Sequence, residues 1–327
     1  MKRFYIALLM PACLIAACGG GGNSPGTDNN VPPPSAAIGI TSTNAMQVSQ
    51  VAYQAVVSSG EIADLAGDSG LTADAGGNVA KTTINRKAAG AVSTVAQQVA
   101  NGPTILNCAV EGSLTVTANL DNPLTLSAGD TITAEYMGCD DGTGEVIDGT
   151  LSFVVDVFDG DILSGLYLMT MTMELLDFQV RTAEDVLMAN GDGTATLDTR
   201  LAPYVEASVR GDAMISDTNS SSEALTNYSS AQTFDGRLDP APYTLIASGT
   251  LDSSSLAGSI VYSTPVTFEG LGESYPNRGE LLVAGMNSSA RLIAQENGID
   301  VHIQIDSDGD TVIDETIMTT WTELAAM

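Results

Sequence analysis

The sequence "GTLSFVVDV", residues 149–157, places an apolar side chain at every second position. The repeated positions are Leu151, Phe153, Val155 and Val157. A period of two is the spacing of a β-strand that turns one face toward a core and the other toward water. We therefore predict a strand here, with these four side chains facing inward.

The same alternation recurs through most of the chain beyond residue 105. It is found in "SLTVTANL" (113–120), "DTITAEYMG" (130–138), "LYLMTMTMELL" (166–176), "GSIVYSTPV" (258–266) and "RLIAQENGIDVHIQID" (291–306). The segments are separated by turn-forming sequences such as "DDGTG" (140–144), "NGDG" (190–193) and "NRGE" (277–280). This pattern predicts a mainly β fold, in which residues 105–327 form an antiparallel meander shaped as a large curved sheet or a partly closed barrel.

Two segments ahead of these strands have helical periodicity. In residues 43–67, Asn44 and Gln47 fit an N-cap and its capping-box partner. Apolar residues recur there at helical spacing, at Val48, Val51, Ala52, Ala55 and Val56. Residues 84–103 predict a second helix that stops at Asn-Gly-Pro. We expect the two to form a small helical hairpin, residues 37–104, whose apolar faces pack on the rest of the chain.

The N-terminal residues are typical of an export signal. Lys2 and Arg3 precede an apolar stretch, residues 4–17, that is too short to span a bilayer as a helix. We predict that residues 1–17 are a signal peptide that is removed. Residues 18–36 are rich in glycine, asparagine and proline, a composition that cannot pack a core and that predicts a flexible tether.

The sequence "LIAAC", residues 14–18, resembles the lipobox of bacterial lipoproteins. The resemblance implies that Cys18 is lipidated and becomes the new N-terminus. Gly19 stands where the inner-membrane retention signal of such proteins has aspartate, so the resemblance implies the outer membrane, on either of its faces. The alternative is an ordinary secretory signal that is cleaved nearby and leaves Cys18 unmodified.

The chain is strongly acidic, with a formal charge of −29 from 40 acidic and 11 basic residues. Such a charge repels nucleic acid and anionic lipid head groups, so we expect neither as a partner. Solubility explains the acidity more simply than a dedicated cationic partner does.

Cys108 and Cys139 are the two cysteines of the predicted folded body. Export would place them in an oxidising compartment, where a disulfide is the default. A cysteine-based metal site would need histidine or further cysteines nearby, and His302 is the only histidine in the chain. We therefore predict a structural disulfide between Cys108 and Cys139.

Four aspartates crowd into "DSDGDTVID", residues 306–314, at Asp306, Asp308, Asp310 and Asp314. Counted as an EF-hand loop, the segment has Thr311 where glycine is required and Ile317 where a bidentate glutamate is required. The flanking "VHIQI" and "TVIDETI" alternate like strands, which favours a hairpin with Gly309 in the left-handed region. The pattern favours a plain acidic turn, with weak calcium binding by the four carboxylates as the alternative.

Met169, Met171 and Met173 alternate on one predicted strand, so their thioethers share a face. Thioethers are soft ligands that suit Cu(I). Tyr167 and Leu175 continue the same face, which favours core packing by methionine over a copper site.

Two long segments carry a further resemblance. Residues 107–153, beginning "NCAVEGSLTV", and residues 277–324, ending "DETIMTTWTEL", resemble recurring segments of uncharacterised exported or lipoprotein-type proteins of Gram-negative bacteria. The resemblance implies paired cysteines, an acidic hairpin and Trp321 after it. It supports localisation and architecture and implies no activity.

The sequence provides no catalytic constellation. One histidine gives neither a Ser-His-Asp triad nor a histidine-rich metal cage, and no phosphate-binding glycine loop occurs. We predict a non-enzymatic, lipid-anchored envelope protein with a binding or structural role, which requires no cofactor beyond the candidate calcium. Its expected partners are the membrane, through the lipid, and an unidentified envelope ligand or protein. The alternatives are a carrier of a lipid or other hydrophobic ligand in a concave sheet, and a hydrolase of envelope glycans or peptides.

Overall fold

The computed structural model of the protein describes residues 35–63 and 102–326, apart from residues 123–124, 141, 143, 162–163, 184–185, 219–220 and 273. The predicted signal peptide, Cys18, the tether up to residue 34 and the predicted second helix up to residue 101 lie outside the described residues. No helix within the described ranges is long and apolar enough to cross a membrane.

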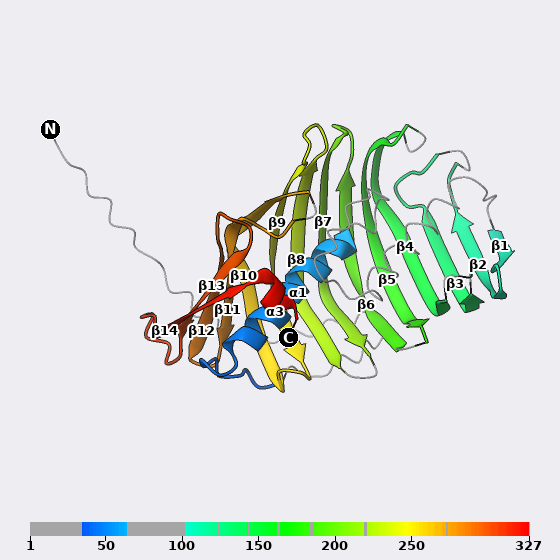
Figure 1. Ribbon diagram of the computed structural model, residues 1–327. Coiled ribbons are helices and arrows are strands. Elements are labelled where there is room, and N and C mark those ends of the chain that lie inside the picture. The colour runs from blue at the N-terminus through cyan, green and yellow to red at the C-terminus, as the bar shows by residue number, and fades with distance from the viewer. Residues whose placement is uncertain are drawn as a thin grey trace, which may run out of the picture. The chain divides into compact units, whose positions relative to one another are not determined.

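One antiparallel sheet of 14 strands makes up most of the described chain, and each strand pairs with the strands before and after it in sequence (Figure 1). The strands are β1 Gly102–Asn107, β2 Glu111–Asn119, β3 Thr131–Asp140, β4 Val146–Asp161, β5 Leu166–Arg181, β6 Val186–Asp198, β7 Tyr204–Asp217, β8 Ser222–Asp235, β9 Pro242–Ser253, β10 Gly258–Leu271, β11 Arg278–Gly285, β12 Ser288–Ala294, β13 Asp300–Asp306 and β14 Glu315–Thr320. The predicted antiparallel meander is confirmed. It is an open sheet with β1 and β14 at its edges, and it begins slightly before the predicted boundary at residue 105.

The strand predicted at residues 149–157 exists, but it changes phase before its end. Leu151, Phe153 and Val155 are buried, as predicted, whereas Val157 is 43% exposed. The pairing of β4 with β5 shifts between Val155 and Val157, which marks a β-bulge. The prediction for Val157 was therefore wrong, because one extra residue turns every later side chain to the opposite face.

The predicted turn at "NGDG" was also wrong. Residues 190–193 lie within β6, and the register with β7 shifts between Gly191 and Thr194. Gly191 has φ of 155°, and a side chain there would collide with the backbone of the neighbouring strand. Here the glycines allow an irregular strand to pass close to its neighbour, so they do not end it.

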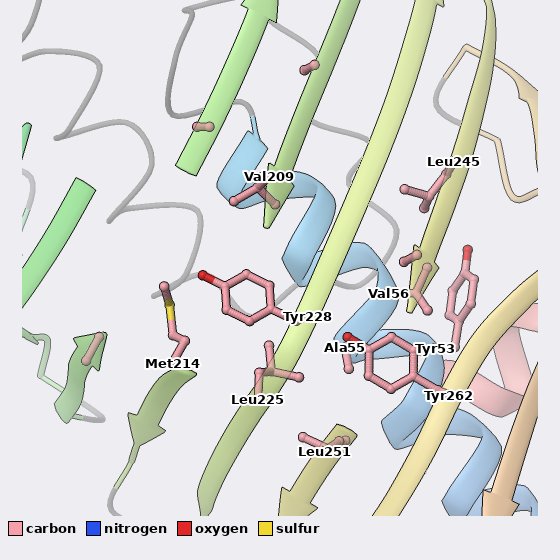
Figure 2. Packing of buried hydrophobic residues seen from close by; sticks show 14 of the residues in the cluster. Tyr53, Ala55, Val56, Val209, Met214, Leu225, Tyr228, Leu245, Leu251 and Tyr262 are labelled. Carbon is pink, nitrogen blue, oxygen red and sulfur yellow. The ribbon is translucent and has the colours of Figure 1, made fainter. Parts of the chain in front are cut away.

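The core lies on one face of the sheet. Met169, Met171 and Met173 are each 1% exposed within it, which confirms core packing for these methionines. Figure 2 shows Tyr228 and Tyr262 of the sheet on the side where α1 brings Val56.

Helix α1, Ala45–Ala63, packs across β6–β9 and β11–β13. The five predicted apolar positions of its stripe are all buried. The predicted capping box was wrong. The Asn44 side chain accepts from Thr41 N and donates to Gly39 O, while Gln47 Nε2 donates to Ser255 O. Asn44 therefore bonds to the turn that precedes the helix, and Gln47 bonds to the turn between β9 and β10.

An aromatic cluster joins the N-terminal helix to the C-terminus. The short helix α3, Trp321–Ala325, places Trp321 with its ring centroid 4.6 Å from Tyr53 of α1 and 5.5 Å from Tyr275. Phe268 of β10 completes the cluster, 5.7 Å from Tyr53. Trp321 Nε1 donates to Pro276 O at 3.1 Å, so this buried polar group is satisfied. The two ends of the described chain are therefore held together by aromatic packing.

The predicted disulfide is present. Cys108 follows β1, Cys139 lies in β3, and their Cα atoms are 5.4 Å apart. The bond ties the edge hairpin of β1 and β2 to the third strand.

Candidate functional site

The meander gives the sheet two ends with different connections. The odd-to-even turns, from β1–β2 to β13–β14, share one end, because strand direction alternates. Ser35 N donates to Asp252 and Ala37 pairs with Ser259 beside the β9–β10 turn, so the predicted tether joins the body here. We call this the tether end and the opposite one, with the even-to-odd turns, the far end.

The acidic loop, residues 306–314, lies at the tether end. Asp306 is 5% exposed, and its carboxylate accepts from Gly309 N at 2.7 Å and from Thr311 N at 3.0 Å. Carboxylate oxygens of Asp306, Asp308 and Asp314 lie within 4.8 Å of one another. The structure thus brings together three of the four predicted ligands, with spacing suited to a cation.

Asp310 does not join that group. Its carboxylate accepts from Val312 N at 2.8 Å. Gly309 has φ of 78°, as the hairpin prediction required, and Thr311 has φ of 71°. The second strand of the hairpin begins only at Glu315, so the predicted strand from residue 311 was wrong for its first four residues. Much of the hydrogen bonding in this loop is internal.

A groove with a volume of about 630 Å³ crosses the polar face of the sheet from β5 to β10. Nine of its fourteen lining residues are serine or threonine, and Arg210 is the only charged one. The lining consists of Thr170, Thr194, Thr196, Ser208, Val209, Arg210, Ser229, Ser230, Ala231, Ile246, Ala247, Ser248, Ser263 and Thr264. The hydroxyl-rich surface is opposite the face that buries the methionines.

Interruptions of the strand pairing coincide with the groove. The register shifts between β6 and β7 just before Thr194 and between β8 and β9 just before Ser229. β9 and β10 pair only near their ends, and between these stretches Thr264 bridges them. Its buried Oγ1 accepts from Ala247 N at 2.9 Å and donates to Ala247 O at 3.2 Å. Short side chains beside irregular pairing leave an open space above the backbone.

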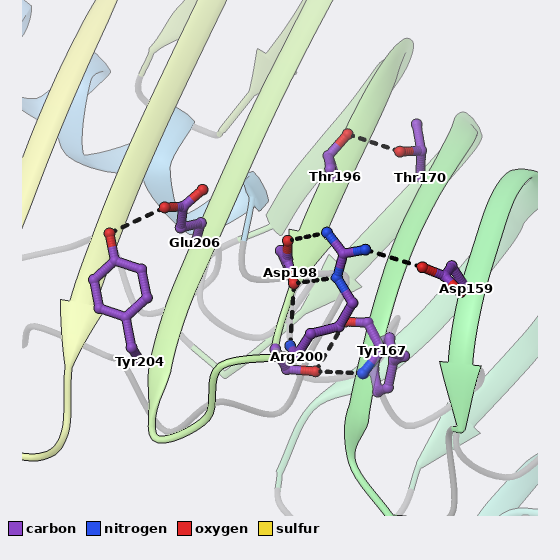
Figure 3. Close-up of polar contacts among 9 residues, drawn as sticks. Asp159, Tyr167, Thr170, Thr196, Asp198, Arg200, Tyr204 and Glu206 are labelled. Carbon is purple, nitrogen blue, oxygen red and sulfur yellow. Dashed lines mark hydrogen bonds and ion pairs between the residues drawn. The ribbon is translucent and has the colours of Figure 1, made fainter.

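Hydroxyl groups in the groove pair across neighbouring strands. Thr170 and Thr196 lie 3.1 Å apart between their Oγ1 atoms (Figure 3), and the Oγ atoms of Ser229 and Ser248 are 3.0 Å apart. One hydroxyl of each pair donates to the other, which leaves one donor and several lone pairs. Each pair can therefore both donate to and accept from a polar ligand.

An ion-pair network continues from the groove toward the far end. Asp198 follows Thr196 by two residues on β6, and its carboxylate accepts from Arg200 Nε at 3.0 Å and Nη2 at 2.7 Å (Figure 3). Arg200 Nη1 reaches Asp159 at 2.9 Å. Hydrogen bonding from Arg200 lowers the pKa of Asp198. The side of the groove that faces the far end is therefore charged, and its charged side chains form ion pairs with one another.

The β8–β9 turn repeats the β6–β7 turn in sequence and geometry. "DTRLAP" (198–203) and "DGRLDP" (235–240) share Asp-x-Arg-Leu-x-Pro. In the second copy, Arg237 Nε and Nη2 each lie 2.6 Å from the Asp235 carboxylate. Gly236 N donates to Pro203 O at 2.9 Å, so the two turns are in direct contact.

Neither the groove nor these turns were predicted from the sequence. The duplicated hexapeptide was a usable signal, since it is visible in the sequence. The groove left no comparable signal, because its lining depends on the register of six strands and on bulges between them.

Comparison of the chain with models of protein families, with curated proteins and with solved structures finds no match.

Proposed function

We propose that this protein is a non-enzymatic, lipid-anchored protein of the bacterial outer membrane whose polar sheet face binds a component of the cell envelope. The anchor rests on the sequence of residues 1–36, in which a signal-like segment ends at Cys18 before a flexible tether. The binding role rests on the groove, whose volume falls within the range of small-molecule sites.

The groove favours a polar ligand over the alternatives. A hydrophobic carrier needs an apolar cavity, whereas nine of the fourteen residues that line this groove carry a hydroxyl group. Glycoside hydrolysis needs two carboxyl groups flanking the bond, and the lining contains none. Asp192 lies nearby on β6 with a pKa raised by burial and by Asp212, but neither residue lines the groove. Binding without chemistry is therefore the better-supported role.

The anchor is tested by labelling cells with radioactive palmitate and fractionating them. We expect label in the wild-type protein, recovery in the outer-membrane fraction, and loss of label in Cys18→Ser. An unlabelled wild-type protein would contradict the proposal.

The binding role is tested by filling the groove. Ser248 and Thr244 lie on the same face of β9, but only Ser248 lines the groove. We expect Ser248→Trp to abolish co-sedimentation of the detergent-solubilised protein with detergent-extracted envelopes from a strain that lacks it, in which no bilayer remains to take up the lipid anchor. The control Thr244→Trp should sediment like wild type. Equal sedimentation of both variants would exclude the groove as the binding site.

Calcium binding at the acidic loop is proposed as a secondary property and has its own control. Asp308 belongs to the three-carboxylate group and Asp310 does not, while each accepts one backbone N–H within the loop. Bound calcium would raise the melting temperature of wild type and of Asp310→Asn, and would raise that of Asp308→Asn less. An unchanged wild-type melting temperature with calcium or with a chelator would leave the loop as a plain turn.

A further inference from the structure

We propose that the groove binds a linear oligosaccharide whose chain lies across the strands. This inference rests on the proposed binding role of the groove and specifies its ligand class. The lining takes one to three residues from each of six adjacent strands, β5 to β10. Five strand spacings of 4.8 Å make such a site roughly 24 Å long, so the ligand is extended.

The chemistry of the lining matches a sugar chain. Sugar hydroxyls donate and accept hydrogen bonds, as do the pairs Thr170–Thr196 and Ser229–Ser248. Ile246, which is 46% exposed, supplies an apolar contact for the C–H faces of sugar rings. A ligand with alternating polar edges and apolar faces meets both kinds of surface.

Other extended polymers fit less well. Nucleic acids and other polyanions need many cations, but Arg210 stands alone in the lining of a chain with a charge of −29. Extended peptides bind mainly by adding to a sheet edge, and this groove lies on a face. A neutral glycan needs no cations, and a glycan with one carboxylate needs only Arg210.

Two matched double variants test the assignment. Thr170 and Thr196 form a cross-strand hydroxyl pair in the groove, whereas Thr233 and Thr244 form such a pair, 2.7 Å apart, outside its lining. Valine keeps the shape of threonine and removes the hydroxyl. Both variants should fold like wild type, which circular dichroism would check.

The measurement is the affinity for linear oligosaccharides, with chitohexaose, cellohexaose, maltohexaose and isolated peptidoglycan glycan strands as probes. We expect at least one to bind far more tightly than its monosaccharide. Thr170→Val/Thr196→Val should weaken that binding about tenfold, and Thr233→Val/Thr244→Val should leave it unchanged. Preference for the peptidoglycan strands would identify the envelope as the source, and preference for another hexasaccharide would identify an external glycan.

Failure of all the probes, or equal affinity of the two double variants, would overturn the oligosaccharide assignment. If Ser248→Trp still abolished envelope sedimentation, the groove would keep its binding role with a ligand of another class. If that variant also sedimented like wild type, the binding role itself would fail.

Discussion

Thr311 is a β-branched residue held at φ of 71°, a conformation that costs an L-residue about 1–2 kcal/mol. Glycine relieves that strain, but its greater backbone freedom stabilises the unfolded state by about 0.5–1 kcal/mol. We therefore expect Thr311→Gly to stabilise the protein by about 0.5–1 kcal/mol, measured by urea unfolding.

The reverse substitution at Gly309 is the control. Gly309 has φ of 78°, and a Cβ there would lie 3.0 Å from Asn287 O. Gly309→Thr should therefore destabilise the protein in the same assay. A loss of stability in Thr311→Gly would show that the threonine side chain contributes more than its backbone strain costs.

At the scale of elements, α3 is short and its attachment depends on one side chain. Trp321 is 1% exposed and contacts rings from α1, β10 and the segment before β11. Trp321→Ala should cost about 3–5 kcal/mol, the usual range for a buried aromatic residue. Met318 of β14 is 75% exposed, so Met318→Ala should change the free energy of unfolding by less than about 0.5 kcal/mol. Guanidinium unfolding measures both effects. Similar effects of the two substitutions would contradict the conclusion that the aromatic cluster holds α3 in place.

Element type was largely predictable from sequence, and the exceptions have local causes. The period of two identified β4 and β5 because a half-buried strand requires that pattern. It could not reveal the bulge at Val157, where pairing with β5 adds a residue to one strand. The turn-forming composition of "NGDG" wrongly assigned Gly191 to a turn, because glycine occurs in turns and in irregular strands alike.

The two candidate sites also differ in how far they could be predicted from the sequence. The acidic loop could be predicted because its residues are contiguous in sequence, although which three aspartates converge depends on the fold. The groove combines one to three residues from each of six strands, among them Thr170 and Ser263, so its prediction needs the pairing register of those strands.

For the whole molecule, buried tyrosines predict a loss of stability in alkali. Burial raises the pKa of Tyr53, Tyr228 and Tyr262, and raises that of Tyr136 to about 12. In the unfolded chain tyrosine titrates near 10, so above that pH the unfolded state releases protons that the folded state retains. Stability should be constant with respect to these groups below about pH 10 and should fall as pH rises toward 12.

Urea midpoints recorded against pH, together with tyrosinate absorbance, measure this effect. Tyr136→Phe removes one of the groups and should lessen the decline. Full ionisation of every tyrosine in the native protein near pH 10 would contradict the prediction.

The order of the strands has a consequence for how the chain acquires its structure. Every strand is adjacent to its sequence neighbours, so the sheet can lengthen hairpin by hairpin as residues emerge, whether from a ribosome or from an export channel. The aromatic cluster differs, because Tyr53 of α1 must wait for Trp321 of α3, which follows all fourteen strands in sequence. A growing chain would thus carry a helix that cannot complete its packing until Trp321 has been synthesised. A chain that stops before Trp321 would leave α1 without this aromatic contact.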